Sequence, residues 1–219
     1  MKIHSAALTL IILSSFLSAN KSIEIDISQQ RLYVYEDKLM LASYPISSSS
    51  FGEGQIENSY KTPLGKHKIL TKIGTNVEKN TIFVSRENMN QVAEIVHERH
   101  NNENDYVTSR ILWLDGLEEG HNKGGNVDSF NRYIYIHGTH EEGLIGEKAS
   151  HGCIRMFNND VIELFSYIPE ETEVNIKIYY LTSCLNANFS FLRSSVGASA
   201  NFPPLLANAT SKSAGFQKS

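Results

Sequence analysis

A cysteine and two histidines lie within the segment 135–156, a combination typical of nucleophilic acyl transfer. Cys153 is the candidate nucleophile, and His137 and His151 are the candidate bases. An isolated cysteine is only a few per cent thiolate at pH 7. A histidine within hydrogen-bond reach can hold the thiolate in an ion pair and lower the thiol pKa from about 8.5 to roughly 4–7. The segment therefore predicts a reactive thiolate at Cys153.

The residues beside Cys153 predict how a substrate is held. Gly152 places no side chain next to the sulfur, so a substrate backbone can approach and backbone N–H groups can face a developing oxyanion. The pattern leaves two roles open for Arg155, which are a two-pronged contact with a substrate carboxylate and a structural ion pair. Ser150 is expected either to hydrogen-bond within the site or to cap a turn, and we favour the turn.

The two histidines differ in their sequence context. His137 follows an alternating apolar segment that predicts a strand, and a strand end holds a general base rigidly. We expect a backbone carbonyl near Gly138 to orient its ring. His151 lies two positions before Cys153, and residues with this spacing in an extended segment point to the same side. On the residues alone, contact between His151 and the sulfur is therefore geometrically allowed.

The number of histidines also raises the alternative of a zinc site. The candidate ligands are His121, His137, His140, His151 and Cys153. No pair among them has the Cys-x-x-Cys or His-Glu-x-x-His spacing of known zinc motifs. The glycine-rich segment Gly116–Gly125 lacks the Gly-Lys-Ser/Thr ending of a phosphate loop. We therefore expect neither a metal nor another cofactor.

Apolar and polar residues alternate along much of the chain, which predicts strands that position these groups. The expected strands span residues 23–27, 32–35, 39–46, 66–72, 81–84, 111–114, 132–136 and 172–178. Helical spacing predicts two short helices, at 88–100 and at 158–168, the second with Asn158 as its cap and Pro169 as its stop. Many strands and few helices favour a mainly β domain over a doubly wound sheet.

The N-terminus predicts a cleaved export signal over residues 1–19. Lys2 is followed by an apolar run of 12 residues, Ala6–Leu17, which is short for a membrane span. Ser18 and Ala19 offer small residues for cleavage. Because no second apolar run predicts a span, we expect no stable membrane span once the signal is removed.

Length, charge and cysteine content bound the class of protein. The 219 residues, 41% of them apolar, suffice for one domain at 20–178, followed by a tail at 179–219 that we expect to be flexible. A net charge of −4 argues against a positively charged surface for nucleic acid, so we expect no nucleic-acid partner. Two cysteines do not make a disulfide framework, although a Cys153–Cys184 bond would block the nucleophile. The sequence does not indicate an oligomeric state.

The motifs resemble the L,D-transpeptidase catalytic domain (YkuD family) of bacterial cell walls. Three blocks carry the resemblance in the family's order: Gln30–Tyr35, Lys61–Ile69, and His137–Thr139 with Ile145-Gly146 and Ser150–Met156. Together they extend over about Ile23 to Ile178. The resemblance implies a β-sandwich-like or barrel-like domain with one or two short helices.

The resemblance also implies a chemistry and a location. Cys153 would be the nucleophile and His137 the base, with His151 shaping the site. The oxyanion and substrate-binding residues would be Gly138, Ser150, His151, Gly152 and Arg155. The partners would be peptidoglycan stem peptides, cross-linked through a cysteine thioester in the periplasm or cell envelope. Two alternatives stay open: an L,D-carboxypeptidase that trims stem peptides, and a non-catalytic wall-binding module.

Overall fold

The computed structural model describes residues 20–100 and 105–179. The predicted signal at 1–19, nearly all of the predicted tail and Cys184 lie outside these ranges. The elements are β1 (Lys21–Asp26), β2 (Arg31–Glu36), β3 (Leu39–Ser47), β4 (Gly65–Ile73), β5 (Thr81–Val84), β6 (Glu87–Val92), β7 (Val107–Gly116), β8 (Tyr135–Thr139), β9 (Ile154–Met156), α1 (Asn158–Tyr167) and β10 (Glu173–Lys177), with short 3-10 turns η1 (Gly125–Val127) and η2 (Glu142–Leu144). Mainly strands with one α-helix confirm the predicted fold class.

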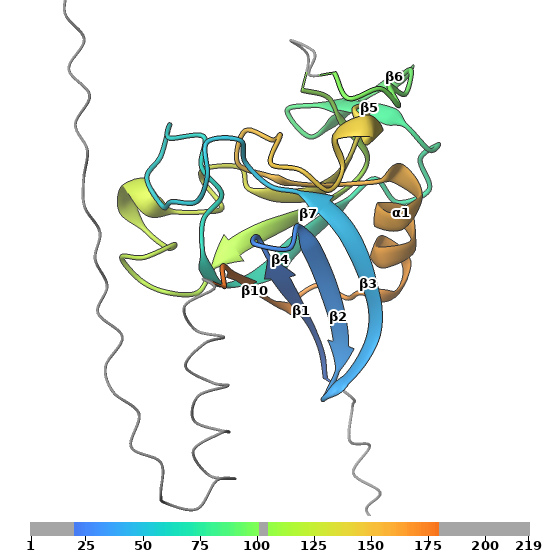
Figure 1. The fold of residues 1–219 in the computed structure, drawn as a ribbon. Coiled ribbons are helices and arrows are strands. Elements are labelled where there is room, and N and C mark those ends of the chain that lie inside the picture. The colour runs from blue at the N-terminus through green and yellow to red at the C-terminus, as the bar shows by residue number, and fades with distance from the viewer. Residues whose placement is uncertain (1–19, 101–104, 180–219) are drawn as a thin grey trace, which may run out of the picture. The chain divides into compact units, whose positions relative to one another are not determined.

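The strands form one sheet that closes on itself. Its order is β4-β10-β1-β2-β3-β9-β8-β7-β5-β6, and β4 also pairs with β7. Strand β7 makes the closure possible because it pairs with β8 along one edge and with β4 and β5 along the other. The ring from β4 round to β7 therefore leaves no free edge, as in a barrel. Figure 1 shows β1, β2 and β3 side by side in this ring.

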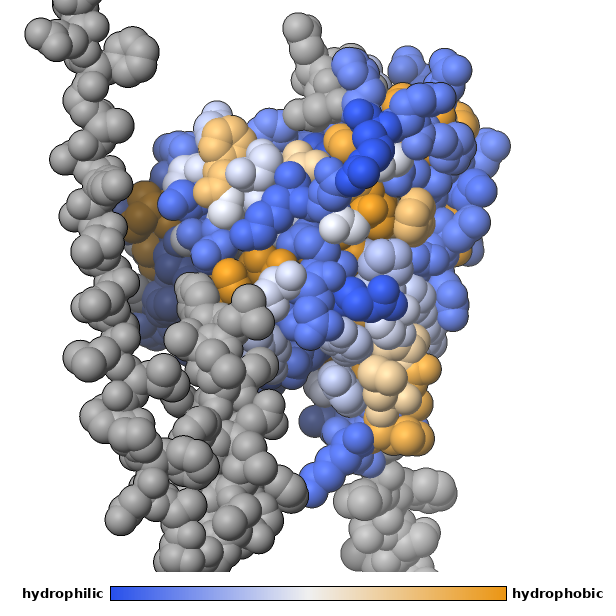
Figure 2. Space-filling view, viewed as in Figure 1, coloured by the Kyte–Doolittle hydropathy of each residue, from blue (hydrophilic) through white to orange (hydrophobic). Residues whose placement is uncertain are grey.

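The core follows the alternation in the sequence. Ile23 and Ile25 of β1, and Leu32 and Val34 of β2, are at most 2% exposed. The helix α1 packs against β7 and β8 and adds its apolar stripe, including Leu164, to the same cluster. Most of the outer surface is polar, and Figure 2 shows apolar colour at the end of the β2–β3 hairpin, where Leu39, Met40 and Leu41 are exposed.

The helix predicted at 88–100 is wrong. Residues Glu87–Val92 form strand β6, which pairs with β5, and no regular element follows as far as His100. The side chain of Asn88 accepts a hydrogen bond from the N–H of Asn90 at 2.7 Å, and Asn90 has a left-handed φ of 53°. Such local side-chain bonds compete with helix formation, and the edge of β5 offers the backbone a partner instead.

The helix predicted at 158–168 is confirmed, but the role of Asn158 is wrong. The N-cap is Phe157, and Asn158 is the first helical residue. Its buried amide donates to the carbonyl oxygen of Thr139 at 2.7 Å and accepts from the hydroxyls of Thr108 and Ser109. Asn158 therefore connects α1 to β7 and β8 instead of capping the helix.

The strand predicted at 132–136 begins three residues later, at Tyr135. Turn chemistry explains the shift, because Asp128 accepts hydrogen bonds from the N–H groups of Gly124 and Asn131. Tyr133 has a φ of 57°, in the left-handed region, which is far from the extended backbone of a regular strand. His137 consequently lies in the middle of β8 and not after its end.

A buried histidine in β4 makes stability dependent on pH. His67 is fully buried, contacts Ser129 Oγ at 2.9 Å, and burial lowers its pKa to about 4. Below pH 6.5, His67 therefore becomes protonated in the unfolded chain, whereas it stays neutral in the folded chain down to about pH 4. We expect His67 alone to remove roughly 1.4 kcal/mol of unfolding free energy per pH unit between pH 6.5 and 4. Urea unfolding of the wild type and of His67→Gln measures this, since the variant should lose stability less steeply. Equal slopes would contradict the assignment.

Candidate active site

The register of two parallel strands brings the predicted residues together. In β8 and β9, Ile136 pairs with Ile154 and His137 pairs with Arg155. Both isoleucines are fully buried in the core. Because neighbours in a strand point to opposite faces, His137 and Arg155 lie on the other face, on the same side as Cys153. One sheet face therefore carries the proposed base and the proposed nucleophile.

The Cys153 thiol contacts backbone groups in this structure. It donates to the carbonyl oxygen of Tyr133 at 3.3 Å and accepts from the N–H of Tyr135 at 3.4 Å. Within residues 20–100 and 105–179, no hydrogen bond joins Cys153 to His137. Burial raises the pKa of the thiol well above its ordinary value. The expectation that the pKa of this thiol is lowered is therefore wrong for the resting site, because desolvation disfavours the thiolate.

His137 is oriented as the sequence suggested. Its Nδ1 lies 2.7 Å from the carbonyl oxygen of Gly138. A carbonyl only accepts, so Nδ1 carries the proton and Nε2 is left to act as a base. Burial lowers the pKa of His137 to about 4, with Asp105 opposing the shift. The resting pair at neutral pH is consequently a neutral thiol and a neutral imidazole.

Gly138 allows the close packing of β8 against β7 and α1, because a side chain there would clash. A Cβ at this position would come within 2.5 Å of Asn158 Oδ1 and 2.8 Å of the carbonyl oxygen of Thr108. The residue is buried in β8, between β7 and β9. Gly138 therefore holds the His137 ring through its carbonyl, whereas the sequence also suggested a contact with substrate.

A tight turn presents Cys153. Ser150 Oγ donates to the carbonyl oxygen of Cys153 at 2.6 Å and accepts from the N–H of Gly152 at 3.2 Å. Gly152 has a φ of 122°, a conformation that L side chains rarely adopt, and its carbonyl accepts from Thr62 Oγ1. Ser150 thus caps the turn, as favoured. The N–H of Gly152 is already engaged, which leaves the N–H of Cys153 as the better candidate donor to an oxyanion.

Arg155 belongs to a buried ion network. Its guanidinium lies 2.7 Å from Asp105 Oδ1 and 2.8 Å from Glu141 Oε2, and its side chain is 1% exposed. Asp105 Oδ2 also contacts His151 Nδ1 at 2.8 Å. Of the two roles left open for Arg155, the structure shows the ion pair. His151 is fixed by Asp105, in agreement with a site-shaping role.

Sequence reasoning missed Asp105 and Glu141. Asp105 precedes β7 and Glu141 follows β8, so neither lies in a motif of its own. Both carboxylates approach Arg155 only because the sheet brings β7, β8 and β9 together. A buried arginine needs such partners, but the sequence does not show that Arg155 is buried.

A pocket of about 250 Å³ opens beside Cys153. Its lining includes Tyr60, Arg132, Tyr133, Ile134 and His151. Cys153 does not line the pocket itself, but its sulfur lies 3.3 Å from the carbonyl oxygen of Tyr133, which is a lining residue. Arg132 stabilises the loop at residues 54–61, because its guanidinium donates to the carbonyl oxygens of Gly54, Gln55 and Lys61.

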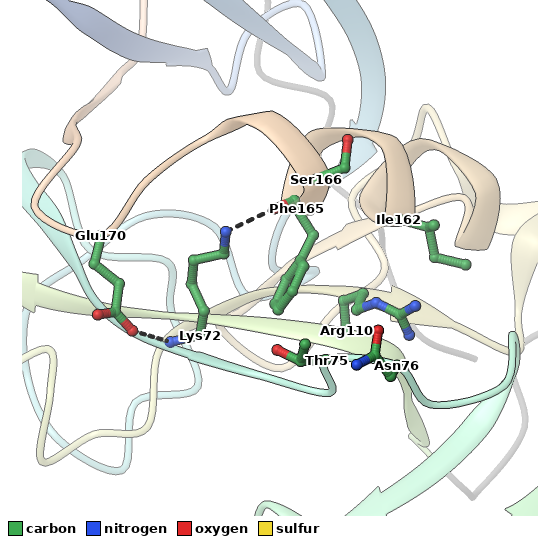
Figure 3. Close-up of a pocket in the computed structure, with 8 residues that line it drawn as sticks. All are labelled: Lys72, Thr75, Asn76, Arg110, Ile162, Phe165, Ser166 and Glu170. Atoms are coloured by element: carbon green, nitrogen blue, oxygen red, sulfur yellow. Dashed lines mark hydrogen bonds between the residues drawn. The ribbon is translucent and has the colours of Figure 1, made fainter.

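A larger pocket of about 600 Å³ lies beside α1 and contains none of the predicted site residues. Figure 3 shows the Phe165 ring between the side chains of Lys72 and Arg110. Lys72 Nζ donates to the carbonyl oxygens of Phe165 and Ile168, at 2.6 and 2.7 Å, at the C-terminal end of the helix. Its cation thus stabilises the helix end. The active-site candidate is therefore the smaller pocket.

Neither residues 20–100 nor residues 105–179 contain a group of three His, Cys, Asp or Glu side chains that could hold a metal ion. In the same ranges, no helix has the length and apolar character to cross a membrane.

The raised thiol pKa predicts slow alkylation of Cys153 at neutral pH. Iodoacetamide reacts with the thiolate, so its rate at Cys153 should fall below that of a small free thiol at pH 7. The rate should continue to rise with pH well beyond about 8.5, the pKa of an unperturbed thiol. Mass spectrometry of the Cys153 peptide over a pH series measures this. A rate that already levels off below pH 7 would show a preformed thiolate.

Comparison with known proteins identifies the domain. The family profile of the L,D-transpeptidase catalytic domain (YkuD) matches residues 20–176. The YkuD protein of Bacillus subtilis strain 168 is 56% identical over 60 residues, which cover 25% of this chain and 37% of that protein. The YqjB protein of the same strain is 51% identical over 45 residues, or 20% and 26% of the two chains. The chain thus spans about a third of the length of the curated relatives it matches.

The chain is also similar to solved L,D-transpeptidase structures. An L,D-transpeptidase from Mycobacterium smegmatis has a TM-score of 0.44 and 17% identity, covering 73% of this chain and 59% of that one. One from Xylanimonas cellulosilytica has a TM-score of 0.41 and 20% identity, covering 73% and 61%. Because the family profile covers most of its length, the chain belongs to the YkuD family of L,D-transpeptidase catalytic domains.

Proposed function

We propose that the protein is an exported peptidoglycan L,D-transpeptidase that forms peptide cross-links through a thioester on Cys153. The observation that carries this proposal is the parallel register of β8 and β9, which sets Cys153 and His137 on one face beside a pocket. Membership of the family supports the class of reaction. Export to the periplasm or cell envelope rests on the sequence of residues 1–19.

The first half-reaction transfers an acyl group to sulfur. The donor is a tetrapeptide stem, cut at the peptide bond before its terminal D-alanine. The thiol turns from the Tyr133 carbonyl toward Nε2 of His137, which takes its proton as Sγ attacks the carbonyl carbon. Backbone N–H groups, the Cys153 amide among them, stabilise the oxyanion, each by about 3–4 kcal/mol. The C–N bond then breaks, and the imidazolium protonates the amine of D-alanine.

The second half-reaction passes the acyl group to an amine. An amino group of a neighbouring stem attacks the thioester carbonyl and loses a proton to His137. The C–S bond then breaks, and the imidazolium returns the proton to the leaving sulfur, which restores the Cys153 thiol. No cofactor is needed because the thioester conserves the acyl energy. Since thiol and imidazole are both neutral at rest, proton transfer accompanies attack instead of preceding it.

The ion network favours this proton transfer. The carboxylate of Asp105 raises the pKa of His137, and Arg155 lowers it to a smaller extent. The net effect of the pair favours the imidazolium that forms during attack. Burial still dominates, so the charge exists only while the sulfur is bonded to substrate.

The proposal is tested with purified protein and disaccharide-tetrapeptides. Mass spectrometry should find a cross-linked dimer together with released D-alanine. A shortened stem without a dimer would indicate an L,D-carboxypeptidase, in which water accepts the acyl group. Unchanged substrate would indicate a non-catalytic wall-binding module and would refute the proposal.

A further inference from the structure

Three exposed aromatic rings cluster beside the pocket near Cys153, and two of them, Tyr60 and His151, line it. The ring centroids of Phe51 and Tyr60 are 5.6 Å apart, and those of Phe51 and His151 are 5.8 Å apart. Phe51 is 52% exposed and Tyr60 is 57% exposed. Large aromatic residues are rarely left this accessible in a group without a partner. We name Phe51, Tyr60 and His151 the aromatic rim.

The pocket behind the aromatic rim is lined by polar side chains that are available to a ligand. Glu57, Asn58 and Asn131 all contribute to its lining. In the described part of the chain, none of their side chains makes a hydrogen bond or an ion pair. They offer amide N–H donors, amide carbonyl acceptors and one carboxylate acceptor to whatever enters.

The same pocket is poorly suited to an anionic group. Arg132 is its one arginine, and both terminal nitrogens of its guanidinium already donate to backbone carbonyls. Glu57 would repel a carboxylate. A neutral ligand with many hydroxyl groups fits the lining better. A pyranose ring has such hydroxyls at its edge and apolar C–H groups on its faces, which stack on the electron-rich face of an aromatic ring.

We propose that the aromatic rim, with Glu57, Asn58 and Asn131, forms a subsite for a neutral sugar ring of the glycan strand. The identity of the glycan as peptidoglycan rests on the proposed function. The stem peptide reaches Cys153 from a sugar, so a bound sugar at the rim would orient the donor. Tyr60 supplies the stacking face, and the two asparagines hydrogen-bond the hydroxyl and acetamido groups. Sugar binding at the subsite needs no thiol chemistry.

The test is equilibrium binding of a tetramer of N-acetylglucosamine, which carries no peptide, to the full chain. Calorimetry or NMR titration should detect binding, and Tyr60→Ala should weaken it about tenfold. Tyr60→Phe should retain most of the affinity because the stacking face remains. Tyr179→Ala is the matched control, since Tyr179 is 46% exposed and lies outside the rim. Asn131→Ala should weaken binding as well.

Two results would overturn the subsite. One is the absence of binding to the wild type, and the other is equal affinity of the wild type and Tyr60→Ala. The outcome is separable from that of the proposed function. An active transpeptidase that binds no oligosaccharide would refute the subsite alone, whereas an inactive protein with Tyr60-dependent binding would refute the proposed function alone.

Discussion

Replacing Cys153 with alanine is expected to abolish turnover of tetrapeptide stems while the protein stays folded. The sulfur is the atom that would carry the acyl group, so no thioester can form without it. The fold should persist because alanine keeps the Cβ at this position, and the two hydrogen bonds of the thiol, to the backbone of Tyr133 and Tyr135, are weak ones. Loss of two such bonds costs about 1–3 kcal/mol, which a domain of this size tolerates.

Mass spectrometry of stem peptides, combined with a thermal melt of each variant, measures this result. Cys184→Ala is the control, since it removes the only other cysteine and leaves the predicted motif intact. It should keep full activity. An active Cys153→Ala protein would refute the assignment of Cys153 as the nucleophile. An inactive Cys184→Ala protein would indicate Cys184 as the nucleophile instead.

Replacing His137 with glutamine is expected to slow turnover by about 10²–10⁴-fold. The reason is that the thiol pKa is raised, so attack depends on a base that removes the proton. We assign this role to His137 because its Nδ1 is held by the Gly138 carbonyl and its Nε2 is left to accept. The same imidazole protonates the leaving amine, so both steps of acylation should suffer.

His151→Gln is the matched comparison. His151 is held by Asp105 at 2.8 Å and lies at the rim of the pocket. This variant should retain measurable activity, since it leaves His137 and Cys153 in place. Initial rates at pH 7 of the two variants decide the roles. If His151→Gln were the slower enzyme, the base would be His151.

The alternation of apolar residues was sufficient to predict most of the barrel. Ile23 and Ile25, or Val174 and Ile176, face the core because one sheet face is buried, and this period is visible in the sequence. The closure of the ring was not visible, because it depends on β7 pairing with β4 and β8 at once. Long-range pairing leaves no local pattern.

Two errors in the predicted elements have specific structural causes. At 88–100 the apolar spacing predicted a helix, but asparagine side chains and the edge of β5 stabilised a strand. At Asn158 the residue type suggested a helix cap, but the side chain is buried and its amide donates a hydrogen bond to the carbonyl oxygen of Thr139 instead. In both cases the tertiary surroundings outweighed a weak local preference.

The sequence indicated which residues the fold brings together at the candidate site, but it did not indicate their electrostatics. The motif predicted that Cys153 and His137 act together, and the structure shows them on one sheet face with the turn that Ser150 caps. It does not reveal that burial raises the thiol pKa, nor that Asp105 and Glu141 enclose Arg155. The pKa shifts and ion pairs at the site depend on which strands pair with each other, because pairing decides which side chains are buried and which charges lie close together. Strand pairing cannot be read from the sequence.

Exposure of the folded protein to a carbapenem tests the central claim most directly. A strained β-lactam carbonyl should acylate the nucleophile and give a thioester that persists when water is excluded. Intact-mass spectrometry followed by peptide mapping should find one adduct per chain, on Cys153, and His137→Gln should slow its formation. An adduct on Cys184, or folded protein that forms no adduct, would contradict the account of Cys153 as an acyl-transfer nucleophile.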